Sequence, residues 1–214
     1  MGLMDRKPQY AQGDMNVLQA IRERRAVRDF TSQPVPQASL RQVISAASWA
    51  PSAMNAQPWH FTVVTDKTIL DEISTRAKAW MLANMPELRQ TGHFRDLLSD
   101  PGFHLFYRAP ALVVISAPAE MQWATEDCAL AAQNLMLAAV DMGLGTCWIG
   151  FAQGWLTSKE GRELLNLAPD KVVVAPIAVG YPKAPPALMP RKAIALSWIG
   201  PKDIQDHGSP HPVH

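Results

Sequence analysis

Apolar residues recur at helical spacing in five stretches of the chain, each bounded by a capping residue, a proline or a glycine. The predicted helices cover residues 14–25, 36–50, 66–80, 120–142 and 157–167. Asp14 is expected to cap the first helix, and Thr157 with Glu160 has the spacing of a capping box. The helix over residues 120–142 is apolar on most of its circumference, which indicates burial on several sides, as a second subunit would provide.

Three short apolar runs predict strands. They cover residues 60–64, 111–116 and 172–179, and residues 193–199 are expected to form a final extended arm. Pro176 interrupts the third run, and because proline lacks the N–H of a sheet ladder, this position is expected at an edge or a bulge. Helices and strands that do not alternate strictly indicate an α+β fold rather than a doubly wound parallel sheet.

The length of the chain suits one domain. It has 214 residues, of which 48% are hydrophobic, and it shows neither an internal repeat nor a linker. We therefore expect a single domain over residues 14–202, with flexible ends at 1–13 and 203–214. Prolines and glycines divide residues 84–108 into short helical pieces and loops.

The charge balance and the cysteines exclude several classes of function. Twenty basic against 19 acidic residues give a net charge of +1, so neither nucleic acid nor an acidic membrane surface is an expected partner. Cys128 and Cys147 lack the spacing of a disulfide framework or a metal site. No apolar run is long enough to span a bilayer, and the first residues do not resemble a signal peptide. These features predict a cytoplasmic protein without a bound metal.

Basic side chains gather at two places. Arg24, Arg25 and Arg28 follow the first predicted helix, and Arg191 and Lys192 lie far along the chain after Pro190. Arginine suits phosphate because its planar guanidinium offers several donors. The simpler alternatives are that the first group complements the dipole at a helix C-terminus and that the second is a solvated surface.

A stiff polar loop connects the second predicted helix to the first strand. Two prolines, Pro51 and Pro58, bracket small residues and the hydrogen-bonding side chains Ser52, Asn55 and Gln57. Such neutral groups suit the polar edge of a heteroaromatic ring or a polyol chain. The alternative is an ordinary proline-rich connection anchored by Trp59.

A glycine-rich segment, Gly-Leu-Gly-Thr-Cys-Trp-Ile-Gly, occupies residues 143–150. Its spacing does not match a dinucleotide-binding or Walker loop. Its glycines would allow backbone N–H groups to meet a planar ligand, or the segment is simply a helix cap followed by a short strand. No hydrolase signature surrounds Cys147, so we do not expect it to be a nucleophile.

In this order, the four segments resemble the nitroreductase family of flavoproteins. The resemblance rests on Arg-Arg-x-Val-Arg-x-Phe (residues 24–30), Ala-Pro-Ser-x-x-Asn-x-Gln-Pro-Trp (50–59), the segment over 143–150, and Pro-Arg-Lys (190–192). It implies an α+β fold with a mostly antiparallel sheet flanked by helices. It further implies an intertwined homodimer in which a C-terminal arm crosses to the partner and FMN lies at the interface.

The resemblance also implies the residues that contact FMN. They are Arg24, Arg25, Ala26, Arg28, Pro51, Ser52, Ala53, Asn55, Gln57, Trp148, Ile149, Gly150 and Arg191. Arg24 and Arg191 would hold the phosphate, with Lys192 as a weaker candidate, and Arg28 would face the pyrimidine edge. The loop after Pro51 would come from the partner subunit, and the backbone near Gly150 would approach flavin N5. No catalytic side chain is implied, since the chemistry takes place on the flavin.

The implied activity is a two-step redox reaction. NADH or NADPH gives a hydride to FMN and leaves, and a small-molecule acceptor such as a nitroaromatic, quinone or enone then takes the electrons. One alternative is a specialised flavin enzyme, a dehalogenase or a flavin-fragmenting enzyme, whose substrate would be recognised by Arg89, His93, Arg95 and Tyr107. The other alternative is an FMN-binding protein without enzymatic activity.

Overall fold

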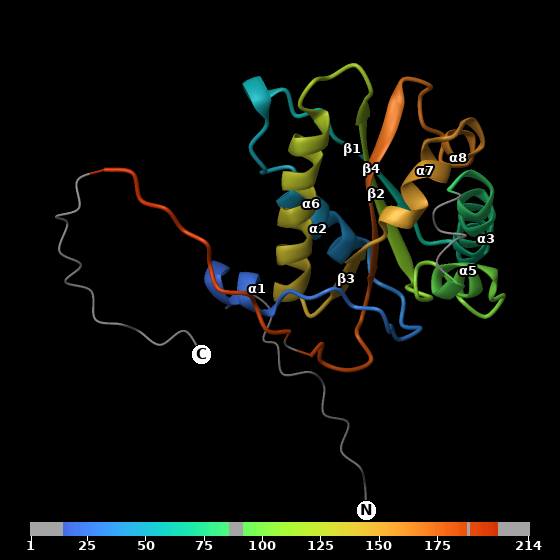
Figure 1. Ribbon diagram of the computed structural model, residues 1–214, viewed down its shortest axis with the longest axis horizontal. Coiled ribbons are helices and arrows are strands. Elements are labelled where there is room, and N and C mark those ends of the chain that lie inside the picture. The colour runs from blue at the N-terminus through green and yellow to red at the C-terminus, as the bar shows by residue number, and fades with distance from the viewer. Residues whose placement is uncertain (1–14, 86–91, 188, 201–214) are drawn as a thin grey trace, which may run out of the picture.

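A four-stranded antiparallel sheet forms the centre of the molecule, in the order β1-β2-β4-β3 (Figure 1). The computed structural model describes residues 15–85, 92–187 and 189–200. The strands are β1 (His60–Val64), β2 (Ala111–Pro118), β3 (Gly145–Trp148) and β4 (Lys171–Gly180). The helices are α1 (Val17–Glu23), α2 (Gln37–Ala47), α3 (Lys67–Asn84), α5 (Gly92–Ser99), α6 (Ala124–Asp141), α7 (Gln153–Thr157) and α8 (Lys159–Leu164), with short 3-10 turns η1 (Ala53–Asn55) and η2 (Gly150–Ala152). The predicted α+β class is confirmed.

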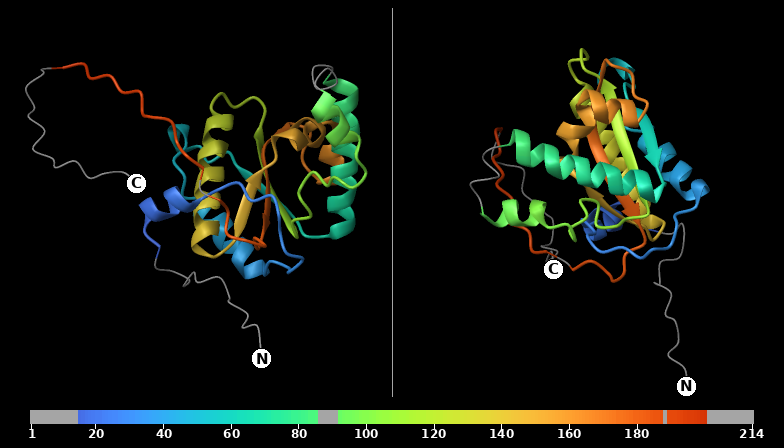
Figure 2. Two further views of the ribbon diagram at one scale, coloured as in Figure 1. Left: turned by 60° about the horizontal axis from the view of Figure 1, so that its bottom comes forward. Right: turned by 90° about the vertical axis from the view of Figure 1, so that its right-hand side faces the viewer.

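Helices cover both faces of the sheet, with α2 and α6 on one side and α3, α5, α7 and α8 on the other (Figure 2). Strand β2 shows why two layers form. Its side chains alternate between the faces, so that Leu112 and Val114 pack toward α3 while Val113 and Ile115 pack toward α6. All four are fully buried. A strand that is apolar on both faces must be covered on both faces. The sheet is therefore enclosed between two layers of helices.

The expected position of Pro176 is wrong in one respect. Strand β4 is an inner strand, not an edge, although a bulge does lie close by. Ile115 pairs with Ala175 and Ser116 with Val173, so Val174 of β4 is the extra residue, two positions before Pro176. The carbonyl of Pro176 accepts the N–H of Ile149 at 2.8 Å, one residue past the end of β3. The nitrogen of Pro176 faces the same side, where the ladder has already ended, and so no N–H is missed.

Both ends of the last predicted helix differ from the prediction. Ser158 rather than Thr157 caps α8, and its Oγ accepts the N–H of Gly161 at 3.2 Å. Thr157 belongs to α7, and its Oγ1 accepts the N–H of Val173 at 3.1 Å. The helix ends at Leu164 instead of residue 167, because Asn166 takes a left-handed conformation with φ +52°.

The longest helix begins later than expected. Residues 119–123 form turns, in which the N–H of Met121 bonds to Pro118, and α6 starts at Ala124 rather than at residue 120. Within residues 84–108, the described part consists of α5 and a series of turns, as the prolines and glycines predict. The first helix is capped by Asn16 rather than by the predicted Asp14, because α1 begins at Val17 and Asn16 Oδ1 accepts the N–H of Gln19 at 3.0 Å. The expected flexible ends 1–13 and 203–214, and Arg89, lie outside the described residues.

Apolar side chains remain exposed at both ends of the described chain. Val17, Leu18 and Ile21 share one face of α1 and are 64%, 60% and 48% exposed. After β4 the chain forms no helix or strand in residues 189–200 and projects away from the body (Figures 1 and 2). Ile194 and Trp198 in this arm are each 88% exposed. Surface of this kind is typical of an interface with another chain.

Candidate functional site

The first basic motif packs directly onto the edge of the sheet. After α1 ends at Glu23, the chain turns and runs beside β3, where the N–H of Val27 bonds to the carbonyl of Thr146 at 2.9 Å. Gly145 permits this close approach, since a Cβ on it would lie only 2.7 Å from the Val27 side chain. Two motifs that are distant in sequence therefore form one surface.

Arg24 and Arg191 share this surface. Burial lowers the pKa of Arg24, and the positive charges of Arg25 and Arg191 lower it further. Arginine nevertheless stays protonated, so these side chains form a cluster of like charges. An anion bound among them would relieve their repulsion, and a phosphate is an anion that arginine binds well. The residues present therefore fit the phosphate end of FMN.

Arg25 takes a different orientation from its neighbours. Its Nη1 donates to the carbonyls of Arg22 and Arg24, at 2.6 and 2.7 Å. These are carbonyls at the end of α1, so Arg25 complements the helix C-terminus as the simpler alternative supposes. A contact between Arg25 and phosphate stays a prediction.

Cys147 lies in β3 and is 3% exposed. Burial raises the pKa of its thiol, although the charges of Arg28 and Arg24 act in the opposite direction. The side chain therefore holds its proton at neutral pH, which makes it a poor nucleophile. Arg28 and Arg24 therefore both lie near enough to Cys147 in β3 for their charges to act on it.

The backbone at the end of β3 offers one exposed position. Ile149 is buried, and its N–H is taken by Pro176. Trp148 is partly buried against α6 and its neighbours. Gly150 is exposed at the start of η2. Of these three residues, Gly150 is therefore best placed to meet a planar ligand with its backbone.

The loop over residues 51–57 is held in a strained shape. Met54, Asn55 and Gln57 have φ angles of 54°, 54° and 48°, a region that L-residues rarely adopt. Polar bonds within the loop support this shape. The N–H of Gln57 donates to Ser52 Oγ, and its Nε2 donates to Asn55 Oδ1, each at 3.0 Å. Hydrogen bonds inside the loop thus support its shape in addition to the two prolines.

This loop lies far from the arginines within one chain. It joins the beginning of α6, where the N–H of Ala53 bonds to Asp127 Oδ1 at 2.9 Å. The segment before Arg24 joins the other end, where the N–H of Met15 bonds to Asp141 Oδ1 at 3.3 Å. Asp127 and Asp141 are fourteen residues apart in one helix, which corresponds to about 21 Å. The predicted site residues therefore form two separate groups in one chain (Figure 1).

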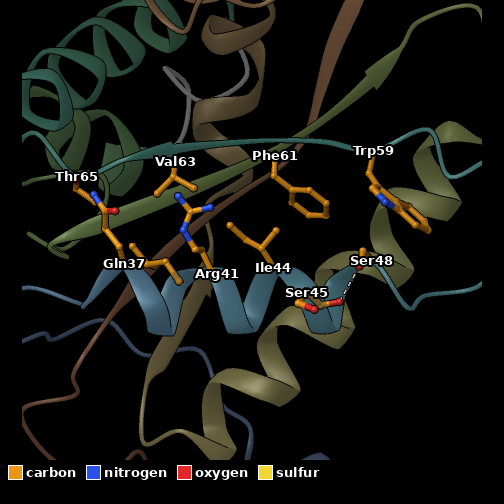
Figure 3. Close-up of a pocket in the computed structure, with 10 residues that line it drawn as sticks. Gln37, Arg41, Ile44, Ser45, Ser48, Trp59, Phe61, Val63 and Thr65 are labelled. Atoms are coloured by element: carbon orange, nitrogen blue, oxygen red, sulfur yellow. Dashed lines mark hydrogen bonds between the residues drawn. The ribbon is translucent and has the colours of Figure 1, made fainter.

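Two features of the molecule were not found from the four sequence motifs. One is a groove of about 750 Å³ between α2 and the edge strand β1 (Figure 3). It is lined by Gln37, Leu40, Arg41, Ile44, Ser45, Ser48, Trp59, Phe61, Val63 and Thr65. The other is the buried carboxylate of Asp127, which a reader of the sequence could have noticed as an acidic residue inside an apolar run.

In residues 15–85, 92–187 and 189–200, there is no group of three or more His, Cys, Asp and Glu side chains that could hold a metal ion. None of the helices in the same residues is long and apolar enough to cross a membrane.

The sandwich of helices around an antiparallel sheet, with arginines and a glycine-rich strand at one edge, defines an α+β protein with a cationic surface at that edge. The model of the nitroreductase family matches residues 21–181. This span covers most of the described chain and three of the four sequence motifs. The chain belongs to the nitroreductase family.

Known proteins of this kind are similar over most of the chain. A nitrobenzene nitroreductase of Ectopseudomonas oleovorans is 31% identical over 195 residues, covering 75% of this chain and 84% of the relative. An iodotyrosine deiodinase of Thermotoga neapolitana is 25% identical over 181 residues, covering 83% and 94%. The crystal structure of a nitroreductase with bound FMN from Bacteroides fragilis has a TM-score of 0.73 and 30% identity, covering 87% and 98%.

Proposed function

We propose that the chain is an FMN-dependent oxidoreductase that uses NADH or NADPH to reduce a small acceptor such as a nitroaromatic, a quinone or an enone. Bound FMN would supply the redox chemistry, since its ring can take a hydride from the nucleotide and give the electrons to the acceptor. The observation that carries the proposal is the surface where residues 24–28 pack on β3 beside Arg191. Family membership and the FMN in the Bacteroides fragilis nitroreductase support it.

We assign the phosphate end of the site to Arg24 and Arg191, with Lys192 beside them. Their mutual repulsion is the physical support, because a dianion placed among them is stabilised by every cation of the cluster. Arg28 is assigned to the pyrimidine edge of the ring. A cation there stabilises the negative charge that reduction places on that edge.

We assign the ring's N5 edge to the backbone at Gly150, which is exposed, with Trp148 and Ile149 forming the strand end behind it. A backbone donor at N5 orients the ring and favours hydride acceptance. The remaining proposed contacts are Arg25, Ala26, Pro51, Ser52, Ala53, Asn55 and Gln57.

The site also requires a homodimer in this proposal. The loop over residues 51–57 and the arginines lie at opposite ends of α6, so a loop from the partner completes each site. The exposed apolar face of α1 supplies part of the surface that two subunits would bury.

We propose that the partner's arm occupies the groove between α2 and β1 (Figure 3). Ile194, Leu196 and Trp198 alternate along the arm, as side chains on one face of an extended segment do. The groove offers apolar side chains such as Ile44 and Phe61, and β1 is an edge strand. An extended segment laid along such an edge buries apolar surface and satisfies the edge's backbone groups.

We propose one domain over residues 14–202, because both apolar clusters share the single sheet. We also propose a cytoplasmic location. The support is chemical: Cys128 and Cys147 are free thiols, which suit a reducing compartment.

The proposed activity is tested by steady-state kinetics with NADH and NADPH against a panel of quinones and nitroaromatics. We expect double-reciprocal plots with parallel lines, since the nucleotide leaves before the acceptor binds. A specialised flavin enzyme would be reduced but would turn over one acceptor class and fail on generic quinones. A flavin-binding protein without activity would not be reduced by either nucleotide, which would contradict the proposal.

A further inference from the structure

Asp127 is a buried carboxylate that the proposed site does not use directly. It lies in the first turn of α6 and is 4% exposed. A buried carboxylate is costly unless hydrogen bonds compensate for its lost hydration. Its Oδ1 accepts the N–H of Ala53, at 2.9 Å, across 74 residues of sequence. The carboxylate therefore connects the helix to the loop over residues 51–57.

A capping role for α6 does not account for this carboxylate. The N-cap of α6 is Trp123, whose side chain accepts no capping hydrogen bond. The first turn favours negative charge, but Glu126 already supplies one and is exposed to solvent. What distinguishes Asp127 from Glu126 is burial and the bond to Ala53.

The loop needs an external support. Three of its residues, Met54, Asn55 and Gln57, have positive φ angles. Asparagine tolerates this region, but Met54 and Gln57 each raise the free energy of the loop by about 1–2 kcal/mol. The bonds among Ser52, Asn55 and Gln57 act inside the loop and do not fix its place on the molecule. In the part of the chain that the structure describes, the Ala53–Asp127 bond is the one hydrogen bond joining residues 51–57 to another element.

We propose that Asp127 is a positioning residue that holds the loop over residues 51–57 in the shape that contacts FMN in the partner's site. The inference rests on the proposed function, which assigns Ser52 and Asn55 to the flavin. Asp127 itself does not touch the cofactor. It acts through the backbone of Ala53, and so on the site of the other subunit.

The direct test measures FMN affinity by titrating apo-protein and following flavin fluorescence and visible circular dichroism. Asp127→Ala removes the acceptor, and we expect FMN to bind about tenfold more weakly. Asp127→Asn keeps an oxygen acceptor in nearly the same place and should bind FMN almost as well as wild type. Glu126→Ala is the matched control, because it removes the same charge from the same turn without touching the loop.

The outcomes distinguish a failure of the positioning role of Asp127 from a failure of the proposed function. If Asp127→Ala binds FMN like wild type, or if Asp127→Asn is as impaired as Asp127→Ala, the positioning role is refuted while the proposed function stands. If the wild-type protein itself binds no FMN, the proposed function fails. The melting temperature of each variant shows whether a loss of affinity is merely a loss of fold.

A hybrid dimer tests whether Asp127 acts on the partner's site. One subunit carries Asp127→Ala, and the other carries Arg24→Ala with Arg191→Ala. If the loop acts across the interface, the arginines of the first subunit and the loop of the second form one intact site, and each dimer binds one FMN with wild-type affinity. If no site binds with wild-type affinity, Asp127 does not act across the interface.

Amide hydrogen exchange keeps the inference testable even if Asp127→Ala does not fold. In the wild-type apo-protein, the Ala53 N–H should exchange more slowly than the N–H of the fully exposed Met54. Equal exchange at the two amides would show that Asp127 does not hold the loop.

Discussion

At the scale of single residues, the proposed FMN site depends on the arginines at the edge of the sheet. Arg24 and Arg191 are distant in sequence, yet the positive charge of Arg191 lowers the pKa of Arg24 in the folded chain. Such a cluster destabilises the protein unless an anion binds to it. Phosphate binding is thus the role that best explains why both cations are present.

Replacing both arginines should weaken FMN binding strongly. Hydrogen bonds to charged groups contribute about 1.5–3 kcal/mol each, so Arg24→Ala with Arg191→Ala should lower the affinity at least about a hundredfold. Equilibrium titration of apo-protein with FMN measures this. Arg76→Ala is a suitable control, since Arg76 forms an exposed pair with Glu72 on α3, away from the site. Equal affinity in the double variant and the control would contradict the assignment.

The sequence predicted the arginine cluster but not the direction of each side chain. Arg25 stands between Arg24 and Ala26 in the motif, and only the fold shows that its guanidinium turns back to the end of α1. Asp127 was missed because its acceptor role depends on a loop 74 residues away. Spacing along a chain reveals which residues are available, whereas orientation depends on the neighbours that folding brings.

At the scale of elements, the packing of residues 26–28 against β3 determines the shape of the site. Gly145 is the residue that makes this approach possible. We expect Gly145→Ala to push Val27 away from the strand and to destabilise the protein by about 1–3 kcal/mol, with weaker FMN binding. Denaturant unfolding measures the first effect and FMN titration the second.

Gly92→Ala provides the control for that substitution, because nothing lies within 4 Å of the added Cβ at the start of α5. It should leave FMN binding unchanged. If Gly145→Ala is as stable as Gly92→Ala and binds FMN equally well, the close packing of the two segments is not what shapes the site.

A second element-scale feature is the attachment of the chain before β2 to α3. His104 Nδ1 accepts the N–H groups of Phe106 and Arg108, and its Nε2 lies 3.2 Å from Asp71. Burial lowers the pKa of His104, and the nearby charges of Arg108 and Lys67 lower it too, while Asp71 opposes them. A protonated His104 would lose the acceptor that holds the two backbone N–H groups.

Stability should therefore fall as the pH falls below about 6.5. The folded pKa of His104 lies below its unfolded value, so the unfolded chain binds the proton first and gains stability relative to the fold. His104→Ala should cost about 1–3 kcal/mol at pH 7 from the unpaired backbone groups, and its stability should depend less on pH in this window. Urea unfolding between pH 5 and 8 measures both effects. If the free energy of unfolding of His104→Ala depends on pH as steeply as that of the wild type, the proposed role of His104 is contradicted.

The elements themselves were largely predictable, and the errors have a common cause. Strands β1, β2 and β4 follow from their apolar patterns, and α3 begins at Lys67, one residue after the predicted start, with Asp66 as its cap. Pro176 was misplaced because a local rule about proline does not reveal where the neighbouring strand ends. Ser158 replaced Thr157 as a cap because Thr157 instead accepts a bond from β4. In each case a tertiary neighbour decided between two locally reasonable choices.

At the scale of the whole molecule, one chain does not bring the two halves of the proposed site together. The loop over residues 51–57 and the arginines flank the ends of α6. In the sequence, the sign of a partner is the apolar circumference of residues 120–142, which does not reveal which surfaces meet. The exposure of the apolar residues of α1 and of the arm is visible only in the structure.

Removing the arm should therefore disrupt both assembly and cofactor binding. A chain that ends at Lys192 keeps Arg191 but lacks Ile194, Leu196 and Trp198, the side chains proposed for the partner's groove. We expect sedimentation or light scattering to show a monomer or a weakened dimer that retains little FMN. A chain that ends at residue 202 is the matched control and should remain a dimer. A shortened chain that stays dimeric and binds FMN normally would contradict the proposed role of the arm.

The most direct test of the central claim is the visible absorbance spectrum of the purified protein, reconstituted with FMN, desalted, and recorded anaerobically before and after addition of NADH or NADPH. We predict a retained flavin band that bleaches with at least one of the nucleotides and returns when a quinone is added. A protein that retains no flavin, or whose flavin band neither nucleotide bleaches, would contradict the account.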